Sequence, residues 1–137
     1  MTRRSRHPAP LTLVREPVLA RSAIAENEAP QVLTGADALV RALVAFGIDT
    51  YFGIPGGPVM PVIDSILRHE NVQFIEPRQE TYAAFEAVGF HRASGRVPGV
   101  VVTAGPGATN AITGIVSAAM DRVPMIVIVG DVPAEST

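Results

Sequence analysis

Glu80 is the residue whose type and position could most readily do chemistry. It follows an apolar segment at residues 72–75 and begins a stretch rich in alanine, including Ala83, Ala84 and Ala87. An acid at the start of a helix is ordinarily explained by its favourable interaction with the helix dipole. At the end of a buried strand, the same carboxyl group could hold and transfer a proton. The residue alone leaves both interpretations open.

Two glycine-containing segments could bring the backbone close to a ligand. They are residues 53–58 (GIPGGP) and 105–107 (GPG), and a backbone without a Cβ can approach a ligand closely. Neither has the full G-x-G-x-x-G spacing of a dinucleotide-binding motif, and a chain without lysine cannot carry a Walker-type loop. Tight turns explain them equally well. Asn110, just beyond the second segment, could cap a helix or face a ligand.

An alternation of helices and strands would position these residues. The apolar pattern predicts helices at 34–46, 59–68, 79–94 and 108–120, and strands at 50–52, 72–75, 99–103 and 125–129. Strands separated by helices make a parallel sheet through right-handed crossovers. Ligands bind beyond the carboxyl ends of such strands, so we expect the glycine segments, Glu80 and residues 130–133 at one edge.

The same pattern predicts how the first helix begins, ends and packs. We expect Thr34 to cap the first helix, Gly47 to end it, and an apolar stripe to face the core. The stripe consists of Ala38, Leu39, Ala42, Leu43 and Phe46. Arg92 and Asp121 are interpreted as helix-end charges.

Length and composition restrict the classes of protein. A chain of 137 residues with 47 % hydrophobic residues suffices for one core. The net charge of −2 disfavours a nucleic-acid partner, and the absence of cysteine excludes disulfides and thiolate chemistry. Three scattered histidines give no metal-ligand spacing, and no apolar run reaches membrane length. Residues 1–30, rich in arginine and proline, are predicted to be a flexible tail, and residues 31–137 the folded domain of a cytoplasmic protein.

Four segments together resemble one family. They are YFGIPGG at 51–57, RQE at 78–80, GFHRASG at 89–95 and TAGPGATN at 103–110. In this order and spacing they look like the N-terminal, pyrimidine-binding domain of thiamine-diphosphate-dependent enzymes. Within these enzymes the segments most resemble acetolactate synthase large subunits. The resemblance covers roughly residues 32–133.

The resemblance implies an α/β fold, a flavodoxin-like parallel sheet with helices on both faces. It implies that Glu80 is the catalytic glutamate, whose carboxyl group hydrogen-bonds N1′ of the cofactor's aminopyrimidine and promotes removal of the C2 proton. It also implies a role in cofactor binding for Pro55, Gly56, Gly57, Thr103, Pro106 and Asn110. The enzyme would decarboxylate a 2-keto acid and join the product to a second carbonyl compound. The family's usual His-Glu pair is Gln79-Glu80 here, and an amide cannot titrate.

The implied cofactors and partners extend beyond this chain. Thiamine diphosphate would need Mg²⁺ held by a second domain, and FAD is an open candidate for the whole enzyme. The domain would form a homo-oligomer, a dimer or tetramer, and meet a diphosphate-binding domain. We expect an N-terminal fragment, truncated on its C-terminal side and inactive alone. A split-subunit decarboxylase, a non-catalytic oligomerisation or regulatory fragment, and an unrelated flavin- or nucleotide-binding module are the alternatives.

Overall fold

A four-stranded parallel sheet forms the centre of the fold. The structure, a computed structural model, describes residues 33–131, so the predicted tail at 1–30 and residues 132–133 lie outside the described part. The strands are β1 (Thr50–Gly53), β2 (Gln73–Ile75), β3 (Gly99–Val102) and β4 (Ile126–Val129), in the order β2-β1-β3-β4. Every pairing is parallel, as the alternating pattern predicts.

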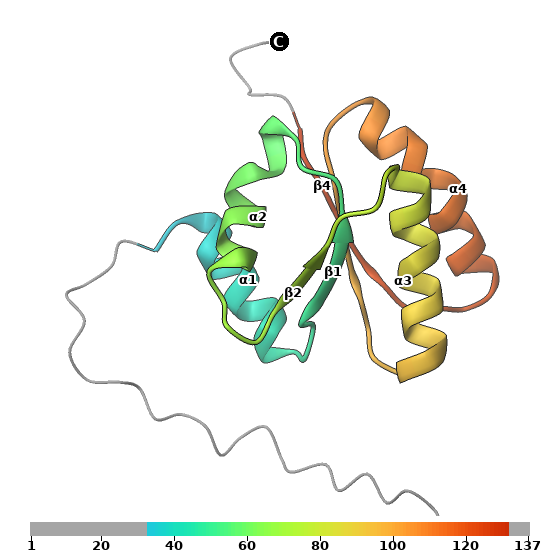
Figure 1. Ribbon diagram of the computed structural model, residues 1–137, viewed down its shortest axis with the longest axis horizontal. Helices are drawn as coiled ribbons and strands as arrows, with labels where there is room; N and C mark the ends of the chain where they lie inside the picture. The colour runs from blue at the N-terminus through green and yellow to red at the C-terminus, as the bar shows by residue number, and fades with distance from the viewer. Residues whose placement is uncertain (1–32, 132–137) are drawn as a thin grey trace, which may run out of the picture. The chain divides into compact units, whose positions relative to one another are not determined.

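Helices cover both faces of this sheet (Figure 1). On one face lie α1 (Gly35–Ala45) and α2 (Met60–Leu67), the latter preceded by the 3₁₀ turn η2 (Gly57–Val59). On the other face lie α3 (Glu80–Ser94) and α4 (Pro106–Met120). The predicted α/β class and element order are therefore confirmed.

Alternating side chains of the central strands build one apolar core on each face. Tyr51 and Val101 pack with α1 and α2, whereas Phe52, Val100 and Val102 pack with α3 and α4. Each of these strand residues is buried. Because helices cover both faces of the sheet, the sequence of β3 is a continuous apolar run instead of an alternating one.

The first helix begins where predicted but turns a different face to the core. The Thr34 hydroxyl accepts from the Asp37 amide, and the Asp37 carboxylate accepts from the Thr34 amide, which makes a reciprocal capping box. The predicted apolar stripe is largely wrong, because Leu39 is exposed and Phe46 is 85 % exposed. Val40 is the fully buried residue of α1 instead. The helix is apolar on more than one side, so periodicity alone could not select the packed side.

The second glycine segment is part of a helix and not only a turn. Helix α4 begins at Pro106, two residues before the predicted start, and Gly105 precedes it with φ +63°. Proline suits the first helical position because its φ is already helical and its missing N–H would have no partner there. Glycine adopts positive φ without steric cost. The GPG sequence therefore starts α4 directly from the end of β3.

Helices α3 and α4 pack side by side with small residues between them. A Cβ added to Gly114 would lie 2.4 Å from the Ala84 Cβ, and Val88 packs against Ala118 one turn further along. Beyond them, Arg92 of α3 forms an ion pair with Asp121, the residue after α4. Equivalent positions on the two helices thus meet along their whole length, which places their N-terminal turns together at one edge of the sheet.

Candidate functional site

The carboxyl edge of the sheet brings together segments that are far apart in sequence. A Cβ added to Gly56 would lie 2.5 Å from the Thr103 Cβ, and one added to Gly107 would lie 2.7 Å from the Thr103 Cγ2. A Cβ added to Gly130 would lie 2.6 Å from the Pro58 Cβ. The loops after β1, β3 and β4 therefore converge as predicted, and glycine is what permits their close approach.

Glu80 lies at this edge as the first residue of α3. Gln79 precedes it with extended backbone angles and makes no side-chain capping bond. The Asn110 side-chain amide, from the first turns of α4, donates a hydrogen bond to Glu80 Oε2 at 3.1 Å. The second oxygen, Oε1, lies 3.6 Å from the point where a Gly107 Cβ would stand. The half-buried carboxyl group therefore sits between the N-terminal turns of the two helices.

Thr81 is a member of this cluster that the sequence reasoning missed. Its hydroxyl donates to the main-chain oxygen of Asn110 at 2.6 Å. The hydroxyl of Thr109 bonds only within its own helix, to the oxygens of Gly105 and Pro106. Nothing in local sequence distinguishes these two threonines, because the partner of Thr81 lies 29 residues away.

The remaining predicted binding residues flank the cluster. Pro55 is exposed on the loop after β1, Gly57 is exposed at the start of η2, and Pro106 is exposed at the first position of α4. A Cβ at Gly57 would meet nothing within 4 Å, so this glycine leaves open space instead of permitting a close contact. The structure thus brings Gly56, Thr103, Glu80 and Asn110 into one cluster, with Pro55, Gly57 and Pro106 around it.

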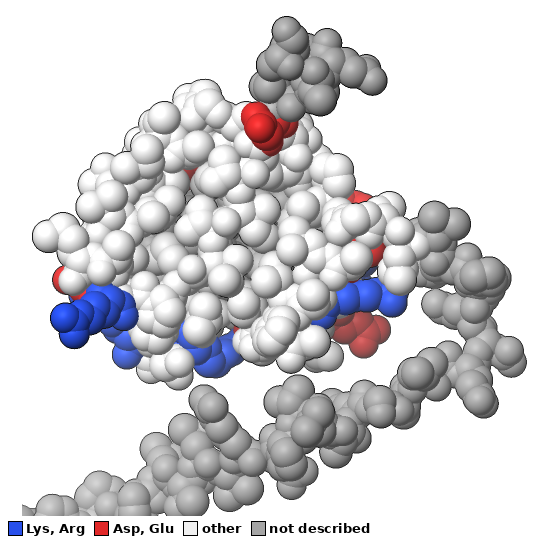
Figure 2. All heavy atoms as spheres, turned by 180° about the vertical axis from the view of Figure 1, so that it is seen from behind, with Lys and Arg blue, Asp and Glu red and all other residues white. Residues whose placement is uncertain are grey.

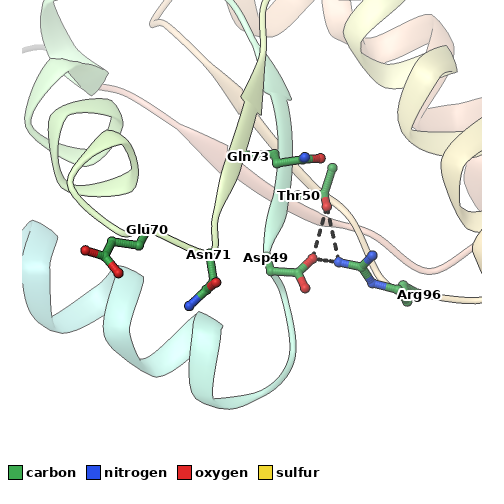
Figure 3. A pocket seen from close by; sticks show the side chains of 6 residues that line it. All are labelled: Asp49, Thr50, Glu70, Asn71, Gln73 and Arg96. Atoms are coloured by element: carbon green, nitrogen blue, oxygen red, sulfur yellow. Dashed lines mark hydrogen bonds and ion pairs between the residues drawn. The ribbon is translucent and has the colours of Figure 1, made fainter.

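A polar hollow of about 340 Å³ lies at the opposite, amino edge of the sheet (Figure 3). Its lining side chains are Asp49, Thr50, Glu70, Asn71, Gln73 and Arg96. Arg96 forms an ion pair with Asp49 and donates to Thr50 Oγ1 at 3.3 Å. Since these residues precede or begin the strands, the hollow is separate from the Glu80 cluster.

Within residues 33–131, no group of three or more His, Cys, Asp or Glu side chains is arranged to hold a metal ion. In this range no helix has the length and apolarity needed to cross a membrane.

Comparison with known proteins identifies the domain to which this edge belongs. Residues 33–137 match the family model described as "Thiamine pyrophosphate enzyme, N-terminal TPP binding domain". The chain belongs to this family. The match includes every described helix and strand and the whole Glu80 cluster.

This TPP-binding domain is similar to the acetolactate synthase large subunits of three organisms. It is 46 % identical over 111 residues to the acetolactate synthase large subunit of Parasynechococcus marenigrum, covering 79 % of the chain and 18 % of that relative. It is 41 % identical over 128 residues to the acetolactate synthase large subunit of Corynebacterium glutamicum, covering 93 % and 19 %. The corresponding protein of Buchnera aphidicola from Schizaphis graminum is 45 % identical over 102 residues, covering 74 % and 18 %. The chain thus spans about a fifth of the length of these relatives.

Proposed function

We propose that this chain forms the pyrimidine-binding part of an acetolactate synthase-like enzyme that acts on 2-keto acids. The observation that carries the proposal is the Glu80 carboxyl group at the carboxyl edge of a domain of the TPP enzyme family. Its relatives bear the name acetolactate synthase, which supports the choice of reaction class.

The residues present fit an aminopyrimidine ring. Gly57, where a Cβ would meet nothing within 4 Å, leaves open space at this edge, and Glu80 Oε1 accepts no hydrogen bond from the described residues. A planar heterocycle needs such an open face together with one hydrogen-bonding group at its edge. We propose that Glu80 is that group, with Pro55, Gly56, Gly57, Thr103, Pro106 and Asn110 lining the ring.

The role proposed for Glu80 is to hold and return a proton. A carboxylic acid can donate a hydrogen bond to a ring nitrogen, which is an acceptor, only while it carries its proton. When bound, thiamine diphosphate supplies the carbon nucleophile that adds to a 2-keto acid carbonyl and accepts the electrons released with carbon dioxide. Glu80 would give a proton to the pyrimidine ring of that cofactor and take it back. Because Gln79 cannot titrate, no second acid–base group from its position takes part.

The test is Glu80→Gln in the intact enzyme loaded with thiamine diphosphate. Hydrogen–deuterium exchange at C2 of the bound cofactor should slow by about 10²–10⁴-fold, the usual contribution of one acid–base group. Glu86→Gln is the matched control, because Glu86 is an exposed glutamate on the same helix. Exchange at the wild-type rate in Glu80→Gln would overturn the assignment.

We also propose the cofactors and partners that the family resemblance implies. Mg²⁺ would bind the diphosphate group through a second domain, and FAD is a candidate for the whole enzyme. The outward side of α3 and α4 carries exposed apolar side chains, and we propose a second copy of the domain as the partner that covers it. These side chains are Tyr82, Phe85, Ile112, Val116 and Met120. Seen from behind, arginines lie along the lower border of the domain, and most of the remaining visible surface is formed by uncharged residues (Figure 2).

Sedimentation of the chain tests the proposed pairing. Phe85→Glu should shift the distribution towards monomer, because a charge buried in an apolar interface is strongly unfavourable. Leu67→Glu is the control, since Leu67 is at least as exposed but lies on α2, on the other face of the sheet. An unchanged distribution in Phe85→Glu, or an equal shift in both variants, would refute the pairing through α3 and α4.

A further inference from the structure

Two hydrogen bonds join the first turns of α3 and α4. The Asn110 side chain of α4 donates to Glu80 Oε2 on α3 at 3.1 Å. The Thr81 side chain of α3 donates to the Asn110 main-chain oxygen on α4 at 2.6 Å. Each helix therefore supplies one side-chain donor and one acceptor to the other. We refer to these two bonds as the Thr81–Asn110 clasp.

The clasp makes the two oxygens of Glu80 different. Oε2 accepts a hydrogen bond from the Asn110 amide, whereas Oε1 accepts none from the described residues and lies 3.6 Å from where a Gly107 Cβ would stand. A carboxyl group with two equivalent oxygens could rotate and present either of them. With Oε2 engaged, the orientation of the group is fixed and Oε1 is the oxygen available to a ligand.

Thr81 fixes the position from which the Asn110 side chain reaches Glu80. Its hydroxyl holds the Asn110 backbone itself, so the side chain of Asn110 starts from a defined place. Thr81 is also next to Glu80 in α3, so the two bonds connect the same pair of helical turns in both directions. The close contact of Gly114 with Ala84 one turn further along fixes the separation of the helices.

From this geometry we infer that Asn110 and Thr81 are positioning residues that orient the Glu80 carboxyl group so that Oε1 faces the aminopyrimidine. Asn110 then acts through Glu80 and not chiefly as a direct ligand of the ring. The inference rests on the proposed function of Glu80. It makes a different prediction from direct binding, because a positioning residue has no effect once the group that it positions has been removed.

A double-mutant cycle on C2 exchange in the loaded enzyme separates these roles. Asn110→Ala should slow exchange by about tenfold or more, the usual effect of losing a hydrogen bond to a charged or acidic group. In the Glu80→Gln background the same substitution should change exchange by less than about twofold. Equal slowing in both backgrounds would overturn the positioning role. If Glu80→Gln alone had no effect, the proposed function itself would fail.

A second measurement needs no cofactor. In the 137-residue chain, solvent exchange of the Asn110 side-chain amide protons should be about tenfold slower than that of Asn71, which is also exposed but donates no side-chain hydrogen bond within the described residues. Glu80→Ala should abolish this protection, and Thr81→Val should reduce it. Thr113→Val, at an exposed threonine on α4, is the matched control and should leave it unchanged. Protection that survives Glu80→Ala would refute the hydrogen bond, and protection unaffected by Thr81→Val would refute the clasp.

Discussion

The contact between Gly114 and Ala84 gives the most demanding test of how the site is held together. A Cβ added to Gly114 would stand 2.4 Å from the Ala84 Cβ and 3.3 Å from the Ala84 main-chain carbon, whereas ordinary contact begins at 3.4 Å. Ala84 is fully buried, and the obstructing atoms belong to a Cβ and to backbone. No side-chain rotation can relieve the overlap, so Gly114→Ala must push α3 and α4 apart.

Two opposing terms set the size of the effect. Replacing glycine by alanine inside a helix is favourable by about 1 kcal/mol. Overpacking a well-filled contact costs about 1–3 kcal/mol. We therefore expect Gly114→Ala to lower the free energy of unfolding by up to about 2 kcal/mol. The separation would also lengthen the 3.1 Å bond between Asn110 and Glu80.

Gly89→Ala is the matched control for this experiment. Gly89 lies inside α3, is exposed, and would meet nothing within 4 Å if it carried a Cβ. The propensity term alone should then raise stability by about 0.5–1 kcal/mol. Urea unfolding of the 137-residue chain, followed by circular dichroism, measures both variants. If Gly114→Ala stabilised the chain as much as Gly89→Ala does, the close-packing argument would be wrong. Adding Ala84→Gly should recover part of the loss by removing the obstructing methyl group.

Four further predictions concern the rest of the fold. Thr34→Ala should cost about 1 kcal/mol at neutral pH through loss of the helix cap, measured by urea unfolding. The Thr34 hydroxyl holds the pKa of Asp37 well below its usual 3.8, so the stability that this acid contributes is present above about pH 4 and lost below it. Asp37→Asn should therefore flatten the acid side of the curve of stability against pH. Burial raises the pKa of Tyr51 to about 12, so the contribution of this residue to stability is complete below pH 10 and lost as the pH rises towards 12. The Tyr82→Phe variant leaves Tyr51 as the single tyrosine, and its phenolate absorbance measures the titration. A midpoint near pH 10 would contradict the prediction. Arg92→Ala should change stability by less than about 0.5 kcal/mol, because its ion pair is exposed, and a loss above 1 kcal/mol would show that the pair does more than join the helix ends.

Element order and type were predictable because they follow from local pattern. Apolar runs separated by helical stretches predicted all four strands, their parallel pairing and the edge at which the loops meet. The start of α4 was misplaced because GPG was interpreted as a turn, although proline also suits the first helical position. The buried face of α1 was largely missed because Leu39 and Phe46 are apolar but exposed.

The site was predictable only as far as a family pattern could be recognised. Glu80 and the glycines stand out in the sequence, and the structure brings Glu80 together with Gly56, Thr103 and Asn110. Thr81 could not be found in this way, because its partner is a backbone oxygen on another helix. A hydrogen bond to the main chain leaves no signature in the type of its partner residue.

The sequence by itself determined the class of fold and the edge that carries the site, and its resemblance to a family singled out Glu80. The fold class and the edge follow from local apolar periodicity, whereas Glu80 taken alone is equally consistent with an ordinary role at a helix N-terminus. The tertiary structure alone decided which face of α1 is buried, how closely α3 approaches α4 and which oxygen of Glu80 is held by Asn110. Those properties depend on contacts between residues that are far apart in the sequence, and such contacts exist only after the helices have packed.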